Sequence, residues 1–401
     1  MRLGRSWGRL GMKSEWTTRS ISDIAEINPR ESISKGSIAK KIPMDVLQPF
    51  TRDVPGYQME KFKGGTRFRN MDTIMARITP CLENGKTAQV RCLDNGEVGF
   101  GSTEYIVFRA KEGTDPDYLY YLICSPLVRD PAIKSMVGSS GRQRVQTDVV
   151  ANLQIAVPDF DEQKNIGGLL KALDDKIQLN TAINKNLEQQ AQTLFDNFYD
   201  SLSGQSCILS EIIDIRDGTH DSPKATEHGY PLVTSKHLLP FGVDTSSANI
   251  ISKADYDKVN ERSKVNTGDI LISMIGTVGL ISYVIDSPVE FAIKNVGLFK
   301  TSQHPSLDLY ILYYLKNKST TQHIENCLAG STQKYISLGE LRKLPIVVPS
   351  PDELAAYNLV VRPIVSEIAL LVQENRRLSD LRDTLLPKLM SGELDVSGLD
   401  I

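Results

Sequence analysis

The chain repeats one sequence plan at an interval of about half its 401 residues. Residues 20–27 (SISDIAEI) are similar to residues 208–215 (ILSEIIDI), and residues 153–158 (LQIAVP) are similar to residues 344–349 (LPIVVP). Further similar pairs lie between them in the same order along the chain. A duplicated sequence predicts two similar globular parts rather than one large domain.

Each copy combines strand and helix signals. Short β-branched runs such as EYIVFRA and DILISMIGTV alternate with Gly, Asn and Pro, which predicts strands joined by turns. The similar segments 117–122 (DYLYYL) and 309–315 (LYILYYL) predict a helix in each copy. We therefore expect a mixed α/β (α+β) fold with a pseudo-twofold internal repeat. The predicted parts are two globular domains and the helical region after each, at residues 14–158, 159–204, 205–349 and 350–401.

The segment after Pro158 carries the clearest helical pattern. Apolar or Asn positions follow one another in alternating steps of four and three, the 3.5-residue period of helices that pack along one another. The pattern recurs 191 residues later, where Arg382 is the one charged member. The predicted helix-pairing residues are Ile166, Leu170, Leu173, Ile177, Asn184, Leu187, Leu194, Phe198, Val361, Ile364, Ile368, Asn375, Leu378, Leu385 and Leu389.

The two predicted helices favour a shared, coiled-coil-like spacer. At ~1.5 Å per residue, each pattern describes a rod of about 50 Å, longer than a small domain needs. Asn184 and Asn375 lie near the two midpoints and would meet if the helices ran antiparallel, where a buried Asn fixes register. Pro363 should bend or start the second helix. The alternative is that each helix packs only on its own globular part.

Charge excludes binding through a global positive field, because 46 basic residues face 49 acidic ones. A local excess exists in residues 52–91, where eight basic side chains face four acidic ones. Residues 1–204 sum to +2 and residues 205–401 to −5, so the second half should make fewer contacts with an anionic partner by itself.

Cysteine usage and hydropathy point to the cytoplasm. The five cysteines are scattered without a CxxC pair, which argues against a disulfide framework or a thiolate zinc site. No apolar run approaches the ~18–20 residues that span a bilayer, so we expect no membrane contact. Residues 1–13 are basic without an apolar core and do not form a secretory signal, and the start at Met1 or Met12 is left open.

Two kinds of segment are candidates for DNA contact. One is the basic window 52–91, and the other is the loop SSGRQRVQ (139–146) with its counterpart GSTQKYIS (330–337). Cationic side chains neutralise phosphates, and bidentate Arg and Gln read guanine and adenine edges. The alternatives are a solvated strand face and structural turns. The predicted DNA-binding residues are Arg67, Arg69, Arg77, Lys86, Thr103, Arg142, Gln143, Arg144, Gln333 and Lys334.

The sequence offers no catalytic or metal site. It lacks a GxxxxGK[ST] loop and a GxGxxG after a strand, and its histidines have no zinc spacing. Asp159, Glu162 and Lys164 superficially resemble a nuclease pattern, but they fall within one helix start. The pair His220-Asp221 is better explained by a turn or a polar loop that faces DNA. We therefore predict neither catalytic residues nor a metal ion.

Several segments together resemble specificity subunits of type I restriction–modification systems. They are residues 71–86 (MDTIMARITPCLENGK), 101–108 (GSTEYIVF), 217–220 (DGTH), 268–279 (GDILISMIGTVG) and 376–394 (RRLSDLRDTLLPKLMSGEL). The last is similar to the family's C-terminal conserved segment almost letter for letter. The resemblance covers nearly the whole chain.

The resemblance implies two target-recognition domains, each followed by a conserved helical region, with the two regions paired antiparallel. Such a subunit does no chemistry and holds no cofactor. It clasps double-stranded DNA at a bipartite, gapped sequence and docks two modification subunits that methylate adenine N6. S-adenosylmethionine, ATP and Mg are expected on the partner subunits, which include restriction subunits in some systems.

Two other functions stay open at this point. The first is a helical adaptor that bridges protein partners without reading bases, which the repeat and the helices would equally suit. The second is a solitary enzyme, which the missing motifs disfavour.

Overall fold

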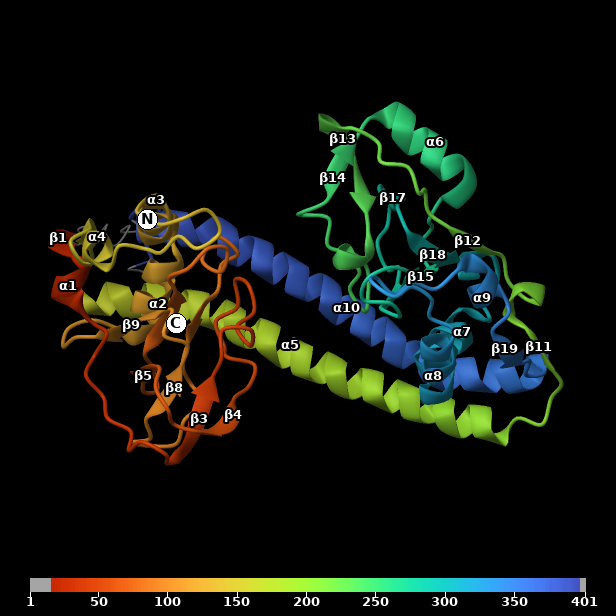
Figure 1. Cartoon of the computed structure of the whole chain (residues 1–401), viewed down its shortest axis with the longest axis horizontal. Helices are drawn as coiled ribbons and strands as arrows, with labels where there is room; N and C mark the ends of the chain where they lie inside the picture. The colour runs from red at the N-terminus through yellow and green to blue at the C-terminus, as the bar shows by residue number, and fades with distance from the viewer. Residues whose placement is uncertain (1–15, 397–401) are drawn as a thin grey trace, which may run out of the picture. The chain divides into compact units, whose positions relative to one another are not determined.

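The computed structural model describes residues 16–396 (Figure 1), so the choice between Met1 and Met12 lies outside the described residues. Contacts divide the chain into two compact units. Among the described residues, unit 1 holds 16–178 and 376–396, and unit 2 holds 179–375. Both long helices therefore contribute residues to each unit.

The described part of unit 1 contains three small sheets. The strands and short helices that build it are β1 (Thr17–Ser20), α1 (Ile21–Ile24), β2 (Ala25–Ile27), β3 (Ile38–Ile42), β4 (Gln58–Lys61), β5 (Thr66–Phe68), β6 (Thr73–Ala76), β7 (Thr87–Gln89), β8 (Gly99–Gly101), β9 (Tyr105–Ala110), α2 (Pro116–Cys124), α3 (Pro126–Lys134), α4 (Thr147–Ala151) and β10 (Gln154–Val157). One sheet has the order β2-β9-β6-β7, a second has β4-β3-β8-β5, and β1 pairs with β10. Helix α2 contributes six consecutive buried residues to the core.

Unit 2 is built on the same plan. Its elements before the last long helix are β11 (Ser206–Ile208), η1 (Leu209–Glu211), β12 (Ile215–Asp217), β13 (Ala225–Val233), η2 (Ser235–His237), β14 (Asn249–Ile251), α6 (Lys253–Ser263), β15 (Ile270–Ser273), β16 (Ile281–Tyr283), β17 (Ala292–Ile293), β18 (Val296–Phe299), η3 (Thr301–Gln303), α7 (Asp308–Lys316), α8 (Lys318–Asn326), α9 (Leu338–Arg342) and β19 (Pro345–Val347). The sheet β12-β18-β15-β16 repeats β2-β9-β6-β7, and β14-β13-β17 repeats β4-β3-β8. The predicted α+β class and internal repeat are confirmed.

A buried ion pair recurs in the two copies. The carboxylate of Asp72 accepts from Arg109 at 2.7 Å, and that of Asp269 accepts from Lys300 at 2.5 Å. Each carboxylate also accepts from the backbone N–H three residues before it, at 2.8 Å. Each carboxylate therefore joins the turn before β6 or β15 to a cation on the neighbouring strand segment. Loss of the cation would leave the carboxylate buried without its charged partner, which costs stability.

The copies differ beside the second sheet. Strand β5 follows β4 in unit 1, whereas helix α6 follows β14 in unit 2. Helix α6 begins after Ser252, whose side chain accepts from the Asp255 N–H, and it packs Val259 inward. Figure 1 shows α6 on the side of unit 2 away from α5 (Phe160–Ser201).

The long helices α5 and α10 (Pro351–Met390) are antiparallel within each unit. In unit 2, Asn180 of α5 contacts Asn375 of α10 at 2.9 Å, and Phe198 stacks on Tyr357 with ring centroids 4.9 Å apart. Residue numbers therefore rise along α5 as they fall along α10.

In unit 1, Asp174 accepts from Arg382 at 2.7 Å, while Ile166 shares a core with Leu389 and Met390. The alternative that each helix packs only on its own globular part is wrong, because the end of α10 lies in the core of the first copy. Pro363 does not start the second helix, because Pro351 stands first in α10, where a missing N–H costs nothing.

All of the predicted helix-pairing positions are buried or half-buried. The residues in the unit 1 core or packed against it are Ile166, Leu170, Leu385 and Leu389, and those of unit 2 are Leu187, Leu194, Phe198, Val361, Ile364 and Ile368. Leu173, Ile177 and Leu378 are half-buried outside these cores. Arg382, the charged exception in the pattern, is accommodated by Asp174.

The predicted meeting of Asn184 with Asn375 is wrong. Asn375 instead accepts from Asn180 and donates to Thr181 at 3.3 Å, and Asn180, which is fully buried, also donates to Glu374 at 2.7 Å. Asn184 lies one turn further along α5, so its position on an antiparallel partner falls one turn earlier, near Leu371. Its Oδ1 atom is buried without a hydrogen-bond partner among the described residues.

Helix α10 is long and apolar enough, by length and composition alone, to cross a membrane, with 28% of its most apolar window buried. Some apolar side chains of α10 are buried in unit 2. Others, among them Leu359, Val360 and Leu370, are exposed.

We expect Asn184→Leu and Asn180→Leu to shift stability in opposite directions. Asn184→Leu removes an unpaired buried acceptor, so the free energy of unfolding should rise by about 1 kcal/mol. Asn180→Leu also removes an unpaired buried acceptor, but it takes away the donor to the Glu374 carboxylate and to Asn375, so it should lower the free energy of unfolding by about 1–2 kcal/mol. Thermal and urea unfolding measure both. Equal destabilisation by the two substitutions would contradict this assignment of register.

Candidate nucleic-acid interface

A short hairpin holds the first predicted loop against the segment that follows β6. Val137 and Arg144 exchange backbone hydrogen bonds of 3.0 and 2.9 Å, and the Thr79 N–H donates to the Gln143 carbonyl at 3.0 Å. Loop 139–146 is therefore fixed at both its base and its side.

The second copy holds its loop in the same way. Ala329 and Tyr335 exchange backbone hydrogen bonds of 2.9 Å, and the Gly276 N–H donates to the Lys334 carbonyl at 3.2 Å. Tyr335 also bridges to Ile275, as Arg144 bridges to Ile78 in the first copy. The two loops are structural counterparts that present different side chains.

A single carboxylate faces two of the predicted DNA-binding cations in the first loop. Glu104 accepts from Arg144 at 2.7 Å and lies 3.9 Å from Arg77. The Arg144 hydrogen bond lowers the pKa of Glu104, so this carboxylate is charged at neutral pH and offsets both guanidinium groups. Arg142 is exposed and forms no ion pair within residues 16–396, while Gln143 is half-buried and Thr103 exposed.

The second loop carries no such carboxylate. Gln333 and Lys334 are exposed, and the Lys334 ammonium has no ion-pair partner in the described part of the chain. Tyr335 beside them is 44% exposed. This loop offers an amide, a cation and an aromatic ring.

The other predicted cations of unit 1 are engaged to different degrees. Arg69 forms a bidentate contact with Glu31, at 2.5 and 2.8 Å, and this hydrogen bonding lowers the pKa of Glu31. The Lys86 ammonium donates to the Met44 carbonyl at 2.9 Å. Arg67 is half-buried, with its guanidinium 5.8 Å from the Phe62 ring.

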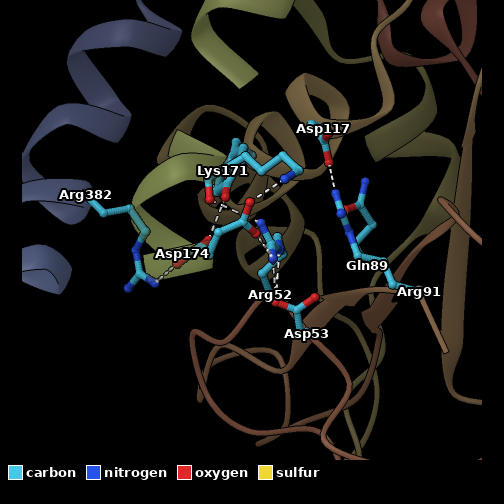
Figure 2. A network of polar contacts seen from close by, with 10 residues as sticks. Arg52, Asp53, Gln89, Arg91, Asp117, Lys171, Asp174 and Arg382 are labelled. Carbon is cyan, nitrogen blue, oxygen red and sulfur yellow. Dashed lines mark hydrogen bonds and ion pairs between the residues drawn. The ribbon is translucent and has the colours of Figure 1, made fainter. Parts of the chain in front are cut away.

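The positive excess of residues 52–91 overstates the charge available for binding. Figure 2 shows Arg52 directed at Asp53 and towards helix α5, where it contacts Asp175 at 2.6 Å, and its side chain is 2% exposed. The same view shows Arg91 paired with Asp117. These cations anchor unit 1 internally.

A second buried network joins α2, α5 and α10 within unit 1. The Tyr121 hydroxyl donates to Asp174 at 2.6 Å, and Arg382 donates to the other oxygen of that carboxylate, as Figure 2 shows for the Asp174–Arg382 contact. Burial raises the pKa of Tyr121, so the hydroxyl keeps its proton and remains a donor. Arg382 is the one charged residue in the apolar pattern of α10. A charge at such a position could have predicted a buried acidic partner.

No group of three or more His, Cys, Asp or Glu within residues 16–396 is arranged to hold a metal ion. The five cysteines are unpaired. His220 contacts Asp217 at 3.0 Å and Asn295 at 2.8 Å.

The duplicated α+β fold and its equivalent loops define the class, a protein of two related domains that each hold one such loop by the same backbone contacts. Residues 13–189 and 207–354 match the family described as "Type I restriction modification DNA specificity domain", and the chain belongs to this family. The resemblance seen in the sequence is confirmed. Members of this family recognise the DNA target within a type I restriction–modification system and are not themselves catalytic.

Individual relatives agree with the family assignment. The specificity subunit of the type I restriction enzyme HindI from Haemophilus influenzae is 22% identical over 95% of this chain and 100% of its own length. The EcoAI specificity subunit from Escherichia coli is 32% identical over 47% of this chain and 33% of its own length. The crystal structure of the type I S subunit from M. genitalium superposes with a TM-score of 0.54 at 15% identity, covering 95% of this chain and 98% of that one, which shows a shared fold.

We expect Glu104→Gln to strengthen binding to DNA of random sequence. The substitution removes the carboxylate that offsets Arg144 and Arg77, so both become available to phosphates. The slope of log K against log salt should steepen by about 0.9 for each phosphate gained. Fluorescence anisotropy across salt concentrations measures affinity and slope.

The matched control is Glu112→Gln, which removes the same charge from an exposed turn of unit 1 where no ion pair is broken. Identical affinity and slope for wild type and Glu104→Gln would show that Arg144 and Arg77 do not approach DNA.

Proposed function

We propose that this specificity subunit reads a bipartite, gapped DNA target, with one half-site read by each globular domain. The observation that carries the proposal is the pair of equivalent loops, anchored by the same backbone contacts but carrying Arg142, Gln143 and Arg144 in one copy and Gln333 and Lys334 in the other. Because the two loops are held in the same way but carry different side chains, we expect the two domains to read different half-sites. Identical loops would instead favour a palindrome.

The chemistry of the loops suits direct readout. Gln pairs with the N6 and N7 atoms of adenine, and Arg pairs with the O6 and N7 atoms of guanine. Lys334 and Arg142, both exposed and outside any ion pair in residues 16–396, supply phosphate contacts that set the register. We assign the recognition domains to residues 14–158 and 205–349.

We propose further that two adenine-N6 methyltransferase subunits dock on the helical regions, residues 159–204 and 350–401. Support comes from apolar side chains that point outward from α5 and α10. Leu359 is 80% exposed, and Val360, Leu370, Leu179 and Ile183 are exposed as well. We infer that a protein partner covers these side chains, because burial of exposed apolar surface favours association.

In this assignment the chemistry belongs to the partner subunits in the cytoplasm. S-adenosylmethionine would bind to the modification subunits, and ATP and Mg to a restriction subunit where one is present. This chain contributes the choice of sequence.

The direct experiment exchanges residues 14–158 for the same domain of another family member. One half of the methylated sequence should change and the other half should be retained, because each domain reads its own half-site. The chimaera is expressed with its modification subunits, and genomic sequencing of N6-methyladenine gives both half-sites and their spacing.

Two results would count against the proposal. A change in both halves would mean that the domains do not read independently. Methylation or binding without any sequence preference in the wild-type complex, at every salt concentration, would favour the adaptor that bridges proteins without reading bases.

A further inference from the structure

A groove in unit 2, distinct from the loop at residues 330–337, runs between helix α6 and the segment Thr219–Pro223. Asp255, Lys258 and Arg262 line the helix side. These three positions follow one another at steps of three and four, so they share one face of α6.

A buried carboxylate fixes both walls of this groove. Asp217, whose side chain is 6% exposed, accepts from His220 on one wall and from Arg262 on the other. His220 and Arg262 are each 63% exposed, and the second ring nitrogen of His220 contacts Asn295 at 2.8 Å. Hydrogen bonds to a charged group are among the strongest, so the two exposed side chains are held in place before any ligand arrives.

The groove presents both signs of charge to solvent. Asp221 and Lys258 are exposed, and neither side chain has a hydrogen bond or ion pair in the described chain. A channel that only follows phosphates would present cations alone. A carboxylate beside a Lys and an Arg instead complements a G·C base pair, because the cytosine N4 amino group donates and guanine O6 and N7 accept.

We propose that this groove is a base-reading site of the second domain that contacts a G·C pair from the major groove. Lys258 and Arg262 face guanine and Asp221 accepts from cytosine N4. The inference rests on the proposed function, and it adds a second point of readout beyond the loop at 330–337. Unit 1 has β5 where unit 2 has α6, so this site belongs to one domain only and contributes to the difference between the half-sites.

The test uses the complex with its modification subunits and two surface variants, Asp221→Ala and Lys258→Ala. Neither side chain supports the fold, so both variants should remain folded, as circular dichroism will check. Binding is measured against a duplex library in which each position of both half-sites is varied. Each variant should reduce the preference for G·C at one position by about 5- to 100-fold, the worth of one good base contact. That position must lie in the half-site retained when residues 14–158 are exchanged.

The matched control is Lys318→Ala, which removes the same charge from an exposed position of α8 in the same unit. It should leave every base preference unchanged. Unchanged preferences in Asp221→Ala and Lys258→Ala, with wild-type specificity intact, would overturn the groove assignment alone. Uniform weakening with a shallower salt slope would also overturn it, because that result marks a phosphate contact. A wild-type complex without any base preference would overturn the proposed function as well.

Discussion

The packing of α5 against α10 is the constraint on which both units depend. Each globular copy completes its core with one part of each helix, as Ile166 and Leu389 do in unit 1 and Phe198 and Tyr357 do in unit 2. Apolar burial supplies most of the free energy, but it tolerates sliding along the helices. Polar contacts at buried positions do not, because a slip would leave an amide or a charge unpaired. The Asp174–Arg382 and Asn180–Asn375 contacts therefore set the register.

The two copies share buried ion pairs and backbone hydrogen bonds, and they differ in the elements and side chains on their surfaces. The buried Asp72–Arg109 pair recurs as Asp269–Lys300, and the same backbone bonds hold the two loops. What differs lies outside, where β5 in one copy is replaced by α6 in the other and where the loop side chains have changed. This division suits a protein that must keep a common frame while the bases it reads vary.

The fold was largely predictable from the sequence, because a repeat and a helical period can both be recognised from the spacing of apolar residues. The 3.5-residue pattern identified the buried faces of both long helices, and the duplicated segments predicted the paired topology. The partner of Asn375 was not predictable, since a shift of one turn keeps the same period and only packing decides it. The number of basic residues in the window 52–91 was a poor guide to the charge available for binding, because a sequence does not show which cations pair with carboxylates after folding. Arg52 and Arg91 count as surface cations in a sequence window, yet each finds a carboxylate inside unit 1. The hydrogen bonds that hold the His220 loop were not predictable either. Asn295 contacts His220 and Arg262 contacts Asp217, and both come from parts of the chain far from this loop in sequence.

The antiparallel register is tested most directly by crosslinking. Cysteines placed at Asn184 and Leu371, which face each other in this register and leave the Asn180–Asn375 contact intact, should be joined in high yield by a short bis-maleimide, and peptide mapping should assign the link within one chain. A matched pair at Asn184 and Leu359 should not be joined, because residue 359 lies about 18 Å further along α10 at ~1.5 Å per residue. Linkage of residues 184 and 359, with none between 184 and 371, would contradict the account.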